Sequence, residues 1–295
     1  MPATGSAGQA AIAVTLLAAY GAPYALRART LARAGRPVPA WRVACFAAGL
    51  LVLAAALSPP FLVASGERFA SHMVEHLLIG DIAPLLIVLG LTGPLLAPLL
   101  RVRGFSYARA LGHPVVAPAL WGANLYLWHL RPAYEAAVAH DPVHVLQHAC
   151  FFLFGANLWM ALLGPLPKPA WFGNGARLAY VLAVRIIATM LAYAFVWADV
   201  AFYPHYAATA AAAGRDPVAD QSAGGAVMLV EESIVIVGLF AWLLARAVRD
   251  AGRRQELAEI AAANGVAVDE RRIARAVAAD QGDALARRLR EAASA

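Results

Sequence analysis

Seven stretches of this chain are long, apolar and almost free of charge. Four of them contain no aspartate, glutamate, lysine or arginine: positions 1–26, 43–63, 110–130 and 142–167. Three more are similar but carry a few ionisable residues: 69–100, 178–198 and 221–245. A helix needs roughly 20 apolar residues to cross a bilayer, and a chain that is 61% hydrophobic is too apolar for an ordinary soluble domain. The sequence predicts an all-α, polytopic membrane protein with seven transmembrane helices.

Basic residues alternate between the connections of these spans. The odd connections hold Arg27, Arg29, Arg33, Arg36 and Arg42, then Arg101, Arg103 and Arg109, then Lys168 and Arg177. The even connections hold one each, Arg68, Arg131 and Arg215. The positive-inside rule places the odd connections and the C-terminus in the cytoplasm and the N-terminus outside. Because membrane topology accounts for where the arginine and lysine residues lie, the pI near 9.7 is not taken as a sign of nucleic-acid binding.

The composition changes near residue 248. The last 50 residues mix ten arginines with eight acidic residues. Apolar residues recur there at helical spacing, namely Ile273, Val277, Leu285 and Leu289. We therefore expect a membrane domain at 1–248 and a charged, helical cytoplasmic tail at 249–295. The tail either binds a surface or is simply solvated.

The eight histidines sort to one side of the predicted membrane. His113 lies at the cytoplasmic start of a span. The other seven lie at outer span ends or in outer connections: His72, His76, His129, His140, His144, His148 and His205. A single histidine in such a place is commonly an interfacial polar residue, which is how we interpret His140 and His205. Polar residues that are repeated inside a membrane span indicate function.

Two histidine pairs have the same spacing. His72 and His76 open one span, His144 and His148 open another, and residues four apart share a helix face. Both spans run inward, so the pairs should meet at a similar depth, with His129 joining from a third span. His76 and His148, which lie deeper, are expected as the core ligands. Imidazoles suit copper, zinc, iron and nickel, whereas axial haem ligation remains an alternative.

Other polar residues are expected to support this site. Glu75 and Asp81 are candidate acceptors that orient the imidazoles. Asp199, Asp220 and Gln221 lie at outer span ends and are expected to border the cluster, although Asp220 also fits a helix cap. Met73 could add a thioether, but it points away from His72 and is more consistent with packing.

The charges deeper in the spans form a second group. Glu231 and Glu232 would be costly there without a partner, and Arg185 is the expected one. Gly224 and Gly225 are expected to allow close helix approach. The two cysteines, Cys45 and Cys150, form neither a disulfide framework nor a CxxC motif.

Several motifs together resemble the seven-helix CtaG family of cytochrome c oxidase assembly factors. They are HMVEHLL, WHLRPAYEAA, HVLQHACFF and DQSAGGAVM, in that order along residues 10–248. The resemblance implies maturation of an oxidase in the bacterial plasma (inner) membrane, with copper handling. It carries over to His72, Met73, His76, His129, His144, His148, Asp220 and Gln221. This chain departs from the pattern at Leu229 and at the acidic pair Glu231–Glu232.

Three functions follow from these observations. The first is a non-enzymatic factor that binds copper at the outer face and delivers it to an oxidase subunit or a copper chaperone. The second is a copper transporter, and the third is a haem-binding membrane redox protein. A retinal photoreceptor is disfavoured because the only lysine, Lys168, lies in a cytoplasmic connection. No nucleophile–base arrangement or nucleotide loop is visible.

Overall fold

The computed structural model describes residues 6–102, 110–278 and 281–292, and these residues are helical with no strand. The helices are α1 (Ser6–Arg33), α2 (Ala40–Ala56), α3 (Pro59–Glu67), α4 (Phe69–Leu77), α5 (Ala83–Gly90), α6 (Gly93–Leu96), α8 (Val116–His129), α9 (Arg131–Ala139), α10 (Asp141–Leu162), α11 (Asn174–Val196), α12 (Pro204–Ala212), α13 (Pro217–Ala263), α14 (Glu270–Ala278) and α15 (Gly282–Ala292). A π-helical turn, η1 (Leu78–Ile82), joins α4 to α5, and a 3₁₀ turn, η2 (Leu99–Arg101), follows α6. The all-α prediction is confirmed for the described residues.

Four described helices are long and apolar enough to cross a membrane: Phe69–Gly90, Asp141–Leu162, Asn174–Val196 and Pro217–Ala263. The pair α2 and α3, bent by 53°, makes a fifth if it forms one broken span. Of the other predicted spans, 110–130 contains α8, which has only 14 residues. A helix of that length rises about 21 Å, less than the hydrocarbon thickness. The span at 1–26 and the bases Arg103 and Arg109 lie partly or wholly outside the described residues.

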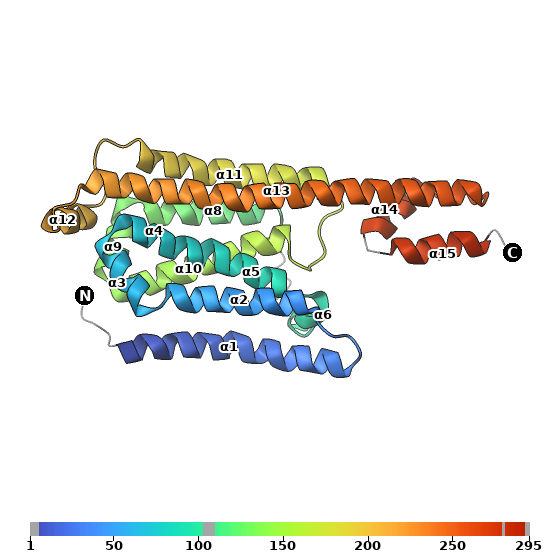
Figure 1. Ribbon diagram of the computed structural model, residues 1–295, viewed down its shortest axis with the longest axis horizontal. Helices are drawn as coiled ribbons and strands as arrows, with labels where there is room; N and C mark the ends of the chain where they lie inside the picture. The colour runs from blue at the N-terminus through green and yellow to red at the C-terminus, as the bar shows by residue number, and fades with distance from the viewer. Residues whose placement is uncertain (1–5, 103–109, 279–280, 293–295) are drawn as a thin grey trace. The chain divides into compact units, whose positions relative to one another are not determined.

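The chain divides into two compact units, Met1–Ile234 and Val235–Ala295. In the first unit, α10 packs against α5, η1, α8 and α9, α2 packs along α5, and α11 packs on α8 (Figure 1). The described part of α1 lies against α2. This arrangement brings α4 and α10, which carry the histidine pairs, next to each other through η1.

Glycine allows two of these close contacts. A Cβ on Gly155 of α10 would lie 1.8 Å from the carbonyl oxygen of Gly80, so only glycine permits α10 to approach η1 this closely. A Cβ on Gly224 would lie 2.5 Å from the Phe69 ring, and one on Gly225 would lie 2.7 Å from the Ala192 carbonyl oxygen. The expectation that Gly224 and Gly225 permit close helix approach is thus consistent with the contacts of α13 with α4 and α11.

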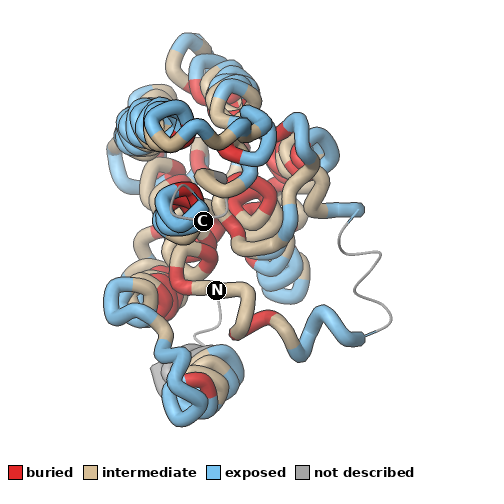
Figure 2. The backbone as a smooth tube through the Cα atoms, turned by 90° about the vertical axis from the view of Figure 1, so that its right-hand side faces the viewer, coloured by how far each residue is buried: buried red, intermediate tan, exposed pale blue. Residues whose placement is uncertain are grey.

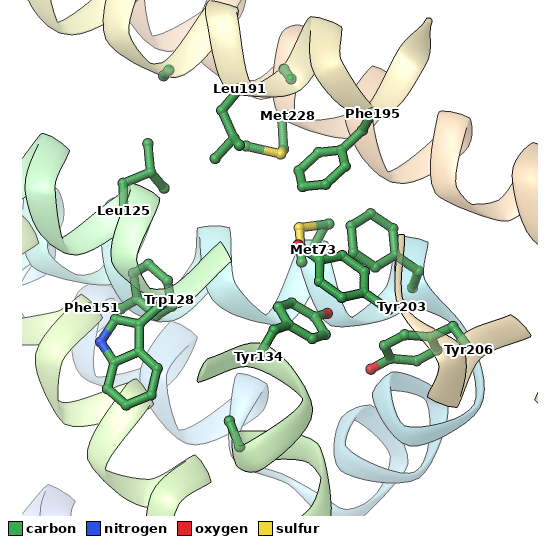
Figure 3. Packing of buried hydrophobic residues seen from close by; sticks show 14 residues of the cluster. Met73, Leu125, Trp128, Tyr134, Phe151, Leu191, Phe195, Tyr203, Tyr206 and Met228 are labelled. Atoms are coloured by element: carbon green, nitrogen blue, oxygen red, sulfur yellow. The ribbon is translucent and has the colours of Figure 1, made fainter. Parts of the chain in front are cut away.

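Buried residues of the first unit lie on the faces that the helices turn toward one another (Figure 2). Its largest apolar cluster joins α4, α8, α9, α10, α11, α12 and the beginning of α13. Aromatic rings dominate it (Figure 3). Tyr134 stacks on Tyr203 with ring centroids 3.9 Å apart, and Phe69 meets Phe195 edge to face. This cluster lies directly beside the histidines and fixes the helices that carry them.

The second unit has a small apolar core of its own. Leu257 and Ala261 of α13 pack with Ile273 of α14 and with Leu285 and Leu289 of α15. The described residues after 248 form the C-terminal part of α13 and the two further helices α14 and α15, and the predicted boundary after residue 248 falls inside α13. Ile273, Leu285 and Leu289, whose spacing predicted an amphipathic helix, are buried against α13.

Candidate metal centre

The two histidine pairs face each other across the contact between α4 and α10. Within each helix the rings are close, with centroids 4.1 Å apart for His72 and His76 and 4.2 Å apart for His144 and His148. Between the helices, His72 and His144 are 5.4 Å apart, and His76 and His148 are 5.5 Å apart. The structure thus brings together the four imidazoles that the spacing predicted would meet.

The four imidazole rings are buried or half-buried, and most of their ring nitrogens lack hydrogen bonds. His72, His76 and His148 are at most 9% exposed, and His144 is half-buried. Among the described residues, no partner is found for Nε2 of His72, His144 and His148 or for either nitrogen of His76. Buried polar atoms are normally satisfied, so each such atom calls for an explanation. Imidazole nitrogens gathered at this spacing are the donors that a transition-metal ion takes, and the residues therefore fit a metal ion.

Tyr206 of α12 orients His72. Its hydroxyl donates to the Ser65 carbonyl oxygen at 2.7 Å and lies 2.9 Å from His72 Nδ1. Burial raises the pKa of the Tyr206 phenol, so the hydroxyl keeps its proton at neutral pH. Because that proton goes to Ser65, His72 Nδ1–H must be the donor to the hydroxyl oxygen. His72 Nε2 is then left with a lone pair available for a metal.

His129, at the end of α8, is oriented in the same way. Its Nδ1 lies 2.7 Å from the Leu125 carbonyl oxygen, which can only accept, so Nδ1 carries the hydrogen. Its Nε2 is buried without a partner. The His129 ring lies 6.4 Å from the His76 ring, beside the cluster. His129 is not a member of either of the two groups of potential metal ligands that are defined below.

Glu75 is a member of the cluster. Its side chain is fully buried on α4, and Oε1 lies 3.4 Å from His148 Nε2, longer than a well-formed hydrogen bond. In the described part of the chain, neither carboxylate oxygen meets the geometry of a hydrogen bond, although the Ser65 side chain interacts with this carboxylate. A buried carboxylate in this state is costly unless a proton or cation neutralises it. Glu75 was expected to orient an imidazole, and its position also suits direct metal ligation.

Five residues form two overlapping donor groups. The first comprises His72, His76 and His144, the second comprises Glu75, His144 and His148, and within each group the ligand atoms lie within 4.8 Å of one another. His144 belongs to both. His76 and His148, which the sequence favoured as a joint core, fall into different groups.

Two predicted supporting residues face away from these donors. Met73 is 1% exposed and lies in the aromatic cluster near Met228 (Figure 3), which agrees with the packing interpretation. Asp81 lies in η1, where its Oδ1 accepts a 2.6 Å hydrogen bond from Trp159 Nε1, and it interacts with Glu231 of α13. The π-helical turn carries Asp81 toward α13 and away from His76.

Three further predicted residues act at the edges of the cluster. Asp220 accepts hydrogen bonds from the backbone nitrogens of Phe69, at 2.8 Å, and Ala70, so it caps α4 rather than its own helix. Gln221 is buried and holds the loop before α12 through Phe202 N and Val200 O. Asp199, in that loop, is exposed. Asp220 and Gln221 thus position the elements that bear His72 and Tyr206.

Sequence reasoning missed Tyr206 and Gln147. Tyr206 is 134 residues from His72, so no local spacing connects them. Gln147 is fully buried, and both of its amide atoms lack a described partner. It lies three residues after His144 on the same helix face, a spacing that points to the cluster.

Comparison with known proteins places the chain in a family. Residues 22–250 match the model of the cytochrome c oxidase caa3 assembly factors. The chain belongs to this family. Similar curated proteins include uncharacterized proteins of Mycobacterium bovis and Mycobacterium tuberculosis, each 25% identical over 190 residues. An uncharacterized protein of Mycobacterium leprae is 25% identical over 170 residues, covering 52% of this chain and 26% of its own length.

The match covers 59% of this chain but only 28% of each of the first two relatives, so the chain spans a little over a quarter of their length. No solved structure matches this chain. Family membership agrees with the presence of helices that can span a membrane.

Proposed function

We propose that this protein is a non-enzymatic assembly factor that binds copper through its clustered histidines and passes it to an oxidase subunit or a copper chaperone. The observation that carries the proposal is the set of buried imidazole nitrogens without hydrogen-bond partners, in a chain of the oxidase assembly family. Nitrogen donors suit copper, which the family resemblance implied as the cargo.

The donor types suit a carrier that must release its metal. Neither donor group contains a cysteine, and Cys45 and Cys150 belong to neither. Thiolates hold copper more tightly than imidazoles, so a histidine and carboxylate site gives up its ion more readily. The helix ends carrying the histidines would face the compartment where the metal is transferred.

The proposal includes a topology. We propose a bacterial plasma membrane protein with seven spans, N-terminus outside and C-terminus in the cytoplasm. The spans are formed by α1, α2 with α3, α4 with α5, the segment 110–130 that contains α8, α10, α11 and α13. Reporter fusions near Ala64, Ala139 and Ala212 should read as external, and those near Arg36 and Lys168 as cytoplasmic. An external signal at Arg36 would reverse the orientation and move the histidines to the other face.

Metal analysis of the purified protein tests the function. Wild type should bind stoichiometric copper without a haem absorption band, whereas a strong haem band would favour the redox alternative. The double variant His76→Ala with His148→Ala takes one member from each donor group and should lose copper. His113→Ala, remote from the cluster, is the matched control and should retain it.

In cells, the double variant should reduce oxidase activity while the protein still inserts in the membrane, and added copper should partly restore that activity. Normal copper content and normal oxidase activity in this variant would show that the histidine cluster is not a copper site. Lost accumulation of copper inside the cell with normal oxidase would favour the transporter.

A further inference from the structure

The cluster contains two donor groups, not one, and this has a consequence for the metal. We propose that one copper ion binds at either of two positions that share His144. The imidazole position consists of His72, His76 and His144, and the mixed position consists of Glu75, His144 and His148. This inference rests on the proposed function, in which the cargo is copper.

The geometry separates the two positions. Donor atoms lie within 4.8 Å of one another inside each group, so small ring rotations suffice to bring three donors to one ion. His76 and His148 belong to different groups, and their ring centroids are 5.5 Å apart and the rings are nearly perpendicular, at 88°. A single ion surrounded by all four imidazoles is therefore not the arrangement that the side chains prepare.

His144 is the ligand that the two positions share. Its Nε2 is buried without a hydrogen-bond partner among the described residues, and one nitrogen lone pair binds one metal ion, so we infer that the two positions compete for this atom. The His144 ring centroid lies 5.4 Å from that of His72 and 4.2 Å from that of His148. His144 is also the least buried of the four, half-buried at the beginning of α10. It can remain bound while the other ligands are exchanged.

Glu75 determines which ion each position prefers. Its carboxylate is fully buried, and among the described residues only the Ser65 side chain and the more distant His148 ring interact with it, so it gains most from a cation of high charge. A carboxylate is also a harder ligand than an imidazole. Cu(II) should therefore favour the mixed position, where the ligand charge offsets part of its own. Cu(I) should favour the imidazole position, which needs no hard ligand.

Tyr206 prepares only one of the positions. Its contact with His72 Nδ1 fixes the lone pair of a ligand of the imidazole position. In the mixed position, Glu75 Oε1 instead lies 3.4 Å from His148 Nε2, so the two donors already converge. Each position thus has its own supporting contact, and each can be altered separately by mutation.

The test is titration of the full-length protein in detergent with Cu(II), followed by pulsed electron paramagnetic resonance, which counts coordinated imidazoles. Wild type should bind one Cu(II) per chain with two imidazoles in the main species. Glu75→Gln, close in size to the natural side chain, should shift the population to three imidazoles. Glu67→Gln, a change at an exposed carboxylate at the end of α3, is the control and should give the wild-type spectrum.

Three single variants complete the test. His148→Ala should also leave a three-imidazole species, His76→Ala should retain the two-imidazole species, and His144→Ala should weaken both by at least tenfold. Identical spectra in wild type and Glu75→Gln, two ions per chain, or full affinity in His144→Ala would each overturn the two-position proposal while leaving copper binding intact. Absence of copper from folded wild type would overturn the proposed function as well.

Discussion

Two polar regions of this protein lie among apolar helices, and they differ in whether their polar side chains are paired with one another. In the region of α11 and α13, Arg185 Nη1 lies 2.6 Å from Glu232 Oε2, and Thr189 and Ser233 add hydrogen bonds of 3.2 Å each. In the histidine cluster, Nε2 of His72, His144 and His148 and both nitrogens of His76 have no hydrogen-bond partner among the described residues. Arg185 was the expected partner of the acidic pair, and its contact is with Glu232, whereas Glu231 lies beside Asp81. The paired charges hold two helices together, whereas the ring nitrogens of the cluster leave lone pairs that can bind a cation.

The largest effect is expected from breaking the ion pair. Arg185→Ala leaves the buried Glu232 carboxylate uncompensated, and losing one partner of a buried pair costs about 3–5 kcal/mol. Thermal unfolding in detergent should show this loss. Replacing both residues, as Arg185→Met with Glu232→Leu, should recover most of the stability because no charge remains unpaired. Equal stability of the single variant and wild type would show that the pair carries no structural load.

The shared ligand should show the opposite pattern. His144→Ala leaves each donor group with two members and should weaken copper binding roughly 100-fold, equivalent to about 2.7 kcal/mol. Its thermal stability without metal should stay near wild type, because the removed Nε2 has no hydrogen-bond partner to lose. Calorimetric titration measures the copper affinity, and a thermal unfolding scan measures the stability. A large loss of stability with little loss of affinity would make His144 a structural residue.

A smaller effect should follow from loosening one ligand. Tyr206→Phe removes the acceptor for His72 Nδ1–H, and loss of such an outer partner costs about 10-fold in metal affinity at the low end. The weakening should be greater for Cu(I) than for Cu(II), since His72 belongs to the imidazole position. Tyr193→Phe on α11 is the control. Equal affinities for both ions in the Tyr206 variant would detach Tyr206 from the site.

The smallest effect is expected at the cap of α4. Asp220→Ala removes the acceptor for the Phe69 backbone N–H and should cost about 1 kcal/mol of stability, as loss of an N-cap typically does. Copper affinity should change less than in Tyr206→Phe, because Asp220 touches the helix and not a ligand. Unfolding scans of this variant and of Glu67→Ala, at an exposed site, provide the comparison. Loss of copper without loss of stability would place Asp220 closer to the metal than the structure does.

The helical class, several long apolar segments and the spacing of the histidine pairs could be predicted from the sequence alone. These properties depend on local spacing: residues four apart share a helix face, so His72 with His76 and His144 with His148 were predictable before any fold was known. The same holds for the helical tail, whose periodicity was visible in Ile273, Leu285 and Leu289. The family resemblance came from the same motifs and agrees with the match to residues 22–250.

Which of these donors come together in one metal-binding group depends on the tertiary structure. The division into two groups around His144, and the entry of Glu75 into one of them, depend on the approach of α10 to η1 at Gly155 and Gly80. Tyr206 reaches His72 across 134 residues, and Asp220 caps a helix 151 residues away. The π-helical turn directs Asp81 toward Trp159 and Glu231 and away from the cluster, although Asp81 had been a candidate acceptor for the imidazoles. Side-chain spacing fixes what one helix presents, but the packing of several helices fixes which of those side chains meet.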